Sequence, residues 1–179
     1  SPGYTSEFAI NAAVVEAKPL NVVSNCNDSG IGSLRAAITY ANANPGTEIV
    51  FDIELANTGY STGEFGPGLV TNEVGANGVF RIMALSKLPS IVADNTYIHG
   101  SAQTRESYNT VGPSVEVRCT VSGAYNGFDI TGDNCTVEGL VISDFNNSGW
   151  RGMEITGAYN HVKYCYIGLD PSGNATRPN

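Results

Sequence analysis

Two six-residue segments in the C-terminal third of the chain are nearly the same. Residues 127–132 read GFDITG and residues 152–157 read GMEITG, an offset of 152 − 127 = 25. Carried on without gaps, this offset superposes three further pairs of residues: Val137 and Val162, Leu140 and Cys165, and Ile142 and Ile167. A period of this length requires similar units to stack on one another, because a single unit cannot bury its own apolar face.

The repeat also indicates which kind of unit is stacked. Alternating apolar residues and Gly or Asn turns within a period near 25 are typical of one coil of a β-solenoid. Residues 94–100 weakly resemble residues 133–139 and extend the pattern upstream. We therefore predict an all-β fold, a right-handed parallel β-helix with a short N-terminal capping α-helix. A β-sandwich that contains two similar hairpins is the alternative.

One α-helix is predicted over residues 34–43. Leu34 and Ile38, with two alanines, occupy the i, i+3, i+4 and i+7 positions of one apolar face. Ser33 directly precedes the helix and is a residue type that caps helix N-termini. Residues 44–46, Asn-Pro-Gly, end the helix, since proline and glycine do not continue one.

The 179 residues suit a single domain, for which we predict four parts. Residues 1–19 form an N-terminal extension, 20–53 a cap, 54–78 a surface insertion and 79–179 the coils. The extension contains an apolar stretch, residues 8–15, that is able to form a strand and to pair with a neighbouring molecule.

Composition excludes two classes of partner. The formal net charge is −8 and the nine basic residues are scattered, whereas a nucleic-acid partner requires a basic face. No apolar run approaches the roughly 18–20 residues that span a bilayer, so no membrane span is predicted. The first residues also lack the charged and apolar regions of a signal peptide, from which we expect a processed chain.

The chain has four cysteines, Cys26, Cys119, Cys135 and Cys165. They contain no CxxC pair and the chain has two histidines, so a zinc site is disfavoured. Their even number favours disulfides in an oxidising compartment over buried free thiols. The repeat places Cys135 and Cys165 roughly 16 Å apart along one strand direction. A bridge requires Cα atoms within about 7 Å, so that pairing is the least favoured and the other two connectivities stay open.

Four Asn-x-Ser/Thr sequons permit N-glycosylation, at Asn27, Asn134, Asn146 and Asn174. Several such sequons occur by chance in an asparagine-rich chain.

The repeat stacks one carboxylate on another, because Asp129 superposes on Glu154. Both lie between inward apolar residues and are expected to point outward. Two carboxylates about 5 Å apart repel each other unless one is protonated or a cation lies between them. A Ca²⁺ site is therefore conceivable, as is an acid and base pair, while two solvated surface carboxylates are the simpler interpretation. The same register places Glu138 on Lys163 as an ion pair.

Residues 30–53, GIGSLRAAITYANANPGTEIVFDI, resemble a segment with which many secreted bacterial and archaeal proteins of the pectin-lyase-like superfamily begin. The later blocks of the same resemblance are residues 88–91, 97–101, 137–142 and 166–173. The resemblance covers about residues 20–175 and implies a right-handed β-helix whose open end the helix closes. Similar proteins begin another coil where residues 174–179 stop.

The superfamily includes adhesins, surface-layer and filament components, and carbohydrate enzymes. Its polysaccharide lyases hold Ca²⁺ in a carboxylate cluster and use a nearby Arg or Lys as base. If this chain is an enzyme, that resemblance points to Asp129, Glu154 and Arg151 as its catalytic residues.

No convergent catalytic set is otherwise present, and we expect a non-catalytic extracellular structural protein, secreted or attached to the cell surface. It would be a self-assembling filament subunit or an adhesin module, joined through its ends and its N-terminal strand. Its partners would be copies of itself or a cell-surface glycan, with no cofactor except a possible Ca²⁺. The alternatives are a carbohydrate-active enzyme fragment (a lyase or a glycosidase) and a glycan-binding module in which Trp150, Tyr159 or Tyr164 stacks on sugars.

Overall fold

The structure is a computed structural model of the whole chain. It describes residues 17–54, 60–61, 68–70, 78–105, 112–119, 125–146 and 149–179. The strand predicted over residues 8–15 lies outside the described residues. No helix in the described part is long and apolar enough to cross a membrane.

Helix α1 spans Leu34–Ala43, as predicted. The Ser33 hydroxyl accepts a hydrogen bond from the Ala36 N–H at 3.2 Å and donates one to the Gly30 carbonyl at 2.7 Å. The four apolar positions of the helix, Leu34, Ala37, Ile38 and Ala41, are all buried. Both the N-cap and the apolar face that the sequence predicts are therefore confirmed.

The first of three sheets, sheet A, has the strand order β1-β2-β6-β9-β12. Its strands are β1 (Val22–Val23), β2 (Glu48–Phe51), β6 (Tyr97–His99), β9 (Thr136–Glu138) and β12 (His161–Lys163). All neighbouring strands of sheet A pair in parallel. A 3₁₀ turn at Gly100–Ala102 follows β6.

Sheet B has the order β13-β10-β7-β5-β4-β3, and sheet C consists of β11 and β8. The strands of sheet B are β3 (Tyr60–Ser61), β4 (Gly68–Val70), β5 (Val79–Met83), β7 (Val115–Arg118), β10 (Leu140–Ser143) and β13 (Tyr166–Ile167). Sheet C comprises β8 (Phe128–Ile130) and β11 (Met153–Ile155). The single antiparallel pair among the described strands joins β4 to β5.

The predicted fold class is wrong. The described residues form three separate, mostly parallel sheets together with one helix, an α/β arrangement rather than an all-β right-handed parallel β-helix. Helix α1 contributes its apolar face to the same core as the strands. Sequence periodicity shows that strands recur and how they align, but it does not show how short strands divide into sheets. The β-sandwich alternative fails too, because the two similar segments pair in parallel and not as hairpins.

The repeat register is confirmed in each of the three sheets. Strands β8 and β11 pair Asp129 with Glu154, β9 and β12 pair Val137 with Val162, and β10 and β13 pair Ile142 with Ile167. Each pair is 25 residues apart. The weak resemblance of residues 94–100 to residues 133–139 is confirmed as a register as well. Strand β6 pairs with β9 at the same offset, 133 − 94 = 39.

The part of residues 54–78 that the structure describes is not only a surface insertion. Strands β3 and β4 lie within it, and β4 extends sheet B by pairing with β5. Gly68 and Val70 of β4 are buried.

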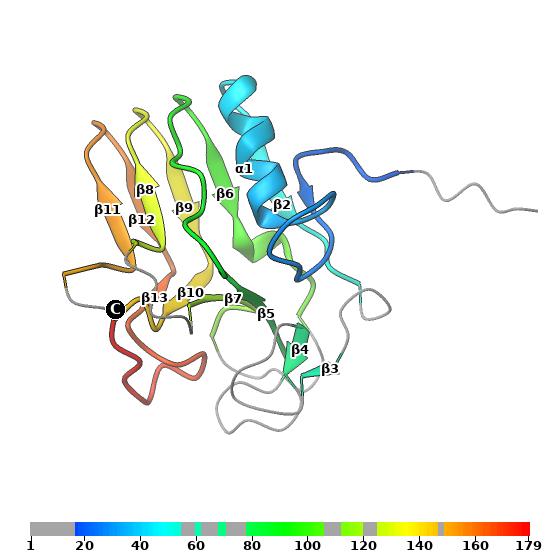
Figure 1. The fold of residues 1–179 in the computed structure, drawn as a ribbon, viewed down its shortest axis with the longest axis vertical. Coiled ribbons are helices and arrows are strands. Elements are labelled where there is room, and N and C mark those ends of the chain that lie inside the picture. The colour runs from blue at the N-terminus through cyan, green and yellow to red at the C-terminus, as the bar shows by residue number, and fades with distance from the viewer. Residues whose placement is uncertain are drawn as a thin grey trace, which may run out of the picture.

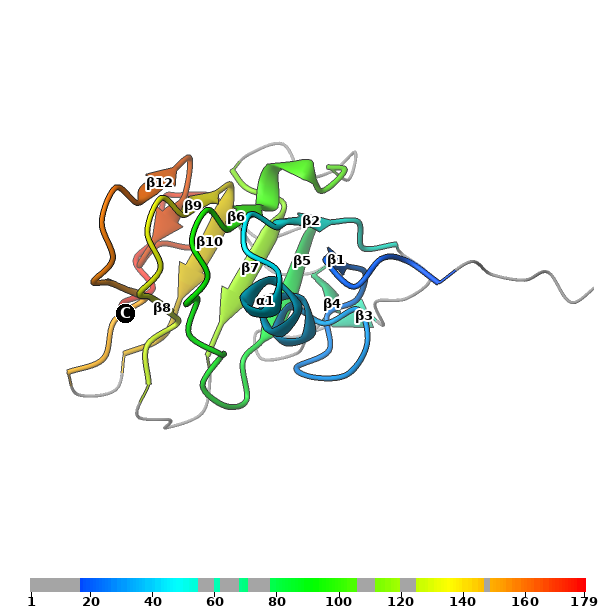
Figure 2. The same ribbon diagram turned by 90° about the horizontal axis from the view of Figure 1, so that it is seen from above.

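The chain progresses along one direction of the molecule. In Figures 1 and 2, α1 and β1 lie towards one end, and β6, β9 and then β12 follow towards the other. Strands β11, β12 and β13, which we call the terminal strands, therefore lie at the end opposite to α1.

Candidate functional site

The terminal strands form the outer edge of every sheet. Sheet A ends on β12, sheet B on β13 and sheet C on β11. In the part of the chain that the structure describes, no strand pairs with the outer sides of these three strands. Unpaired strand edges present rows of N–H and C=O groups that bind another strand. Among the described strands, one end of the molecule thus offers three edges, each of which ends a parallel pair.

The terminal strands also expose apolar side chains at positions that are buried one repeat earlier. Val162 is 39% exposed, whereas its partner Val137 is 1% exposed. The same step occurs from Ile130 to Ile155 (2% to 41%) and from Ile142 to Ile167 (0% to 43%). The described C-terminal residues bond to Gly168 and to the Ile142 carbonyl but leave these three side chains exposed, so a core position becomes a surface position in each sheet.

The opposite end differs, since α1 covers the core there. Its exposed apolar residues lie in the segments around β1 and α1 instead, with Leu20 56% and Ile31 82% exposed. Strand β1 forms the other outer edge of sheet A. Among the strands that the structure describes, sheet A therefore has one unpaired edge at each end of the molecule.

The predicted stacking of Asp129 on Glu154 is present, and the structure shows what separates the two charges. The Asn126 amide donates to Asp129 Oδ1 at 2.7 Å and to Glu154 Oε2 at 2.8 Å. The backbone N–H of Arg151 in turn donates to Asn126 Oδ1 at 2.9 Å. Asn126 is buried, so this amide is a fixed part of the site.

Two cations neutralise the outer oxygens of these carboxylates. Lys87 Nζ lies 2.5 Å from Asp129 Oδ2, and an Arg151 guanidinium nitrogen lies 3.4 Å from Glu154 Oε1. Burial by itself raises the pKa of Asp129, but the hydrogen bonds from Lys87 and Asn126 and the charge of Lys87 outweigh it and lower that pKa. Lys87 and Asn126 thus stabilise the ionised form of Asp129, and a Ca²⁺ site here stays a prediction.

The structure therefore brings together the three residues predicted as a catalytic set, Asp129, Glu154 and Arg151. Sequence reasoning missed Asn126 and Lys87. Position 126 corresponds to position 151 in the next repeat, where the residue is Arg, so the repeat carried no signal for the amide. Lys87 lies outside the repeats altogether.

The predicted pair of Glu138 and Lys163 is adjacent in β9 and β12. The Glu138 carboxylate accepts a hydrogen bond from the Tyr97 hydroxyl at 2.6 Å. The Tyr97 ring stacks on His99 with a centroid distance of 4.7 Å. His99 Nδ1 lies 2.6 Å from Glu48 Oε1, so polar contacts link three neighbouring strands on the outer face of sheet A.

All four cysteines are free thiols in the structure, which does not contain the disulfides that the sequence analysis favoured. Cys26, Cys119 and Cys135 are buried and Cys165 is half-buried. Each of the last three has a polar neighbour: the Cys119 thiol lies 3.3 Å from the Tyr125 hydroxyl, Cys135 Sγ 3.4 Å from the Ala93 carbonyl and Cys165 Sγ 3.3 Å from the Lys163 carbonyl. The cysteines therefore serve as small core residues.

The remaining predicted site residues lie at the surface. The four sequon asparagines, Asn27, Asn134, Asn146 and Asn174, are all exposed, as glycosylation would require. Trp150 is 37% exposed. Glycosylation itself stays a prediction.

Comparisons of the chain with family models, with curated proteins and with solved structures find no match.

Proposed function

We propose that this protein is a non-catalytic extracellular structural subunit that assembles head to tail with copies of itself. The observation that carries the proposal is the exposure of Ile155, Val162 and Ile167 at the unpaired edges of all three sheets. Burying such side chains is favourable by about 25 cal/mol for each Å² of apolar surface removed from water. A strand added to each edge would also satisfy its backbone groups.

A second copy suits this edge because sheet A is parallel throughout and, among the described strands, ends on β1 at one side and on β12 at the other. Strand β1 of the next molecule, placed beside β12, would continue the sheet in the same parallel sense. The exposed Leu20 and Ile31 near β1 would then face the exposed apolar residues of the terminal strands. A contact between two different ends of one molecule does not close on itself and gives open polymers.

The same proposal includes the extracellular location and the part played by residues 8–15. Low charge, exposed sequons and self-assembly together favour a durable object outside the cell. Residues 8–15 would add to the edge of a neighbouring molecule by β-augmentation. The alternative form of this proposal is an adhesin module attached to the cell surface. In that case the terminal strands would bind a cell-surface partner instead of a second copy of the chain.

Sedimentation velocity across a concentration series tests the proposal. We expect the average mass to rise above the 18.8 kDa of one chain, and electron microscopy to show fibres. Val162→Lys places a charge on the terminal edge and should abolish the increase. Val92→Lys is the matched control, because Val92 is 56% exposed but follows Ile91, which pairs with β8 on the side away from β11.

Two results would contradict the proposal. One is a monomer at every concentration, which would mean that no second copy binds the edge. The other is a closed dimer that does not grow, which would exclude the head-to-tail arrangement.

A polysaccharide-cleaving enzyme is the second candidate, favoured by the proximity of Asp129, Glu154 and Arg151. Cleavage that is lost in Glu154→Gln would support it, and absence of cleavage with Ca²⁺ present would count against it. A glycan-binding module that uses Trp150 predicts binding that Trp150→Ala removes.

A further inference from the structure

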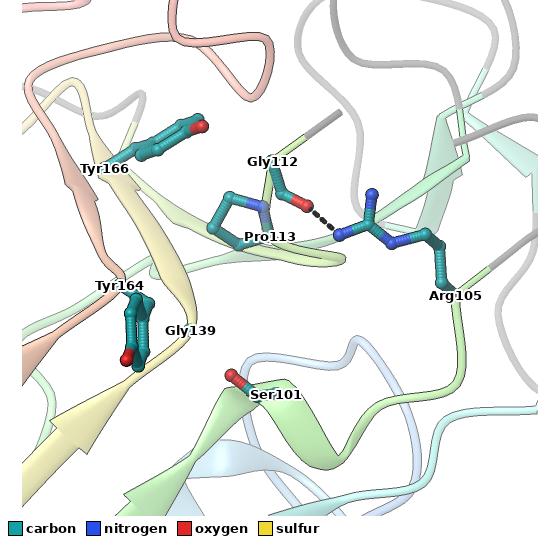
Figure 3. A pocket seen from close by; sticks show the side chains of 7 residues that line it. All are labelled: Ser101, Arg105, Gly112, Pro113, Gly139, Tyr164 and Tyr166. Atoms are coloured by element: carbon teal, nitrogen blue, oxygen red, sulfur yellow. Dashed lines mark hydrogen bonds between the residues drawn. The ribbon is translucent and has the colours of Figure 1, made fainter. Parts of the chain in front are cut away.

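A pocket of about 350 Å³ opens beside the corner that joins β12 to β13. Figure 3 shows Tyr164 and Tyr166 on one side of it, Arg105 across from them and Ser101 below. A second, smaller pocket adjoins it and shares Ser101 and Arg105. The site therefore combines two aromatic rings with one guanidinium and one aliphatic hydroxyl group.

The floor of the pocket is made of backbone that approaches closely. A Cβ atom added at Gly112 would lie 2.9 Å from the ring of Tyr166, and one added at Gly139 would lie 2.6 Å from the backbone nitrogen of Ser101. The Gly112 carbonyl accepts a hydrogen bond from Arg105 at 2.5 Å, which holds this side chain over the floor. The hollow thus depends on glycines at these positions.

Tyr164 is the unusual member of the set. Its φ is +52°, in the left-handed region that bulky residues rarely adopt. One repeat earlier the same corner is Gly139, with φ +69°. Tyr164 is 81% exposed, so packing of its side chain within the molecule does not offset the energetic cost of this backbone conformation. Tyr159 has the same backbone and exposure outside the pocket, so the position of Tyr164 opposite Arg105 and Ser101, and not its φ, is what points to a ligand.

The lining chemistry restricts the class of ligand. Among the described lining residues there is no carboxylate, which disfavours a cation or a basic peptide. Arg105 is the single basic residue among them, which is too little for a polyphosphate. Pro113 is the single aliphatic side chain among them, so a lipid is disfavoured as well. A flat ring that carries hydroxyl groups matches two aromatic faces surrounded by hydrogen-bonding groups.

We propose that this pocket binds a pyranose ring of a carbohydrate, which stacks on Tyr164 and hydrogen-bonds to Arg105 and Ser101. The volume of the pocket is at the lower end of the roughly 300–1,000 Å³ of ligand sites, which suits one or two sugar rings. The proposal does not depend on self-assembly, because the pocket is formed within one chain.

Soluble oligosaccharides with neutral units (glucose, galactose, N-acetylglucosamine) and acidic units (glucuronate) are the probes. Binding to the full chain is followed by saturation-transfer NMR and by titration of tyrosine fluorescence. We expect saturable binding of at least one probe, and about fivefold weaker binding by Tyr164→Gly, since ring stacking contributes on the order of 1 kcal/mol. Glycine accepts a left-handed φ, so this variant should melt at the same or a higher temperature.

Asn95→Gly is the matched control. Asn95 is also left-handed, with φ +58°, and exposed, but it does not line the pocket. Both variants therefore place glycine at an exposed left-handed corner. Asn95→Gly should retain full binding, and Arg105→Gln should weaken it. The proposal is overturned if no probe binds, or if folded Tyr164→Gly binds as tightly as the unmodified chain.

Discussion

Val162 lies beside Val137 in the paired strands β12 and β9, yet 39% of Val162 is exposed and 1% of Val137. The two residues have the same identity, the same register and the same orientation towards the core. They differ because another strand covers Val137 and none of the described strands covers Val162. Position within the stack, and not residue type, decides which apolar residues are available to a partner.

The N-cap of α1 is expected to stabilise the fold measurably. Ser33→Ala removes the acceptor for the Ala36 N–H and the donor to the Gly30 carbonyl. We expect a loss of about 1 kcal/mol in the free energy of unfolding, measured by urea denaturation. Ser86→Ala, at an exposed position outside the helix, is the control and should change little. Equal stabilities of the two variants would show that the cap contributes nothing.

A buried ion pair joins β5 to β7. Arg81 Nε lies 2.6 Å from Glu116 Oε2, neither side chain is exposed, and Ser143 donates to the other Glu116 oxygen at 2.9 Å. Arg177 lies 3.7 Å from that second Glu116 oxygen, so Glu116→Leu removes a carboxylate that two guanidinium groups contact and should cost about 3–5 kcal/mol of unfolding free energy. The double variant Arg81→Met with Glu116→Leu should recover part of this loss in urea denaturation.

An exposed ion pair provides the comparison for that result. Arg151 and Glu154 are 61% and 45% exposed, and Arg151→Ala should cost less than about 1 kcal/mol. The prediction for the buried pair would be contradicted if the double variant Arg81→Met with Glu116→Leu were no more stable than Glu116→Leu alone.

The contact between Lys87 and Asp129 should make stability depend on acid pH. The pKa of Asp129 is lowered in the folded state, so its contribution is present above the unfolded pKa, about 3.9, and is lost as the pH falls through the folded value. Lys87→Gln should therefore destabilise the protein by about 0.5 kcal/mol at neutral pH, and this difference should shrink below about pH 4. Unfolding in urea at several pH values measures it. Ser86→Gln, at the exposed position before Lys87, is the control, and a Lys87→Gln effect that does not vary with pH would exclude the explanation.

The four thiols should react in an order that follows their burial. Burial raises the pKa of Cys26 to about 12 and also raises the pKa values of Cys135 and Cys165, and the thiolate is the reactive form. Cys165 is half-buried and should be alkylated first by iodoacetamide in the native protein. After denaturation without a reductant, mass spectrometry should show all four cysteines alkylated. Uptake at only two of them would demonstrate one disulfide and contradict the free thiols.

The features that were predicted correctly depend on local chemistry or on the repeat. Ser33, the apolar positions of α1 and the Pro-Gly stop specify a helix whatever surrounds it. The spacing between GFDITG and GMEITG aligned Asp129 with Glu154 because identical positions stack in a parallel pair. Strand β4, which lies within the predicted insertion, pairs with β5 although its sequence shows little periodicity, so periodicity gave no sign of this pairing.

The candidate site could be predicted only in outline. Sequence placed two carboxylates side by side, but the amide of Asn126 and the ammonium of Lys87 come from positions without repeat equivalents. The tyrosines were visible as residues able to stack on sugars. Their strain was not, because φ at a corner follows from how the chain turns between two sheets.

The sequence by itself determined the helix, the parallel register and the alignment of successive strands, since these depend on residue type and spacing along the chain. Only the tertiary structure decided that the strands divide into three sheets and that α1 shares their core. It also decided that the cysteines lie apart as thiols and that Val162 is exposed while Val137 is buried. These properties depend on which segments, distant in sequence, pack against one another. The hydrophobic pattern of the sequence does not specify that packing.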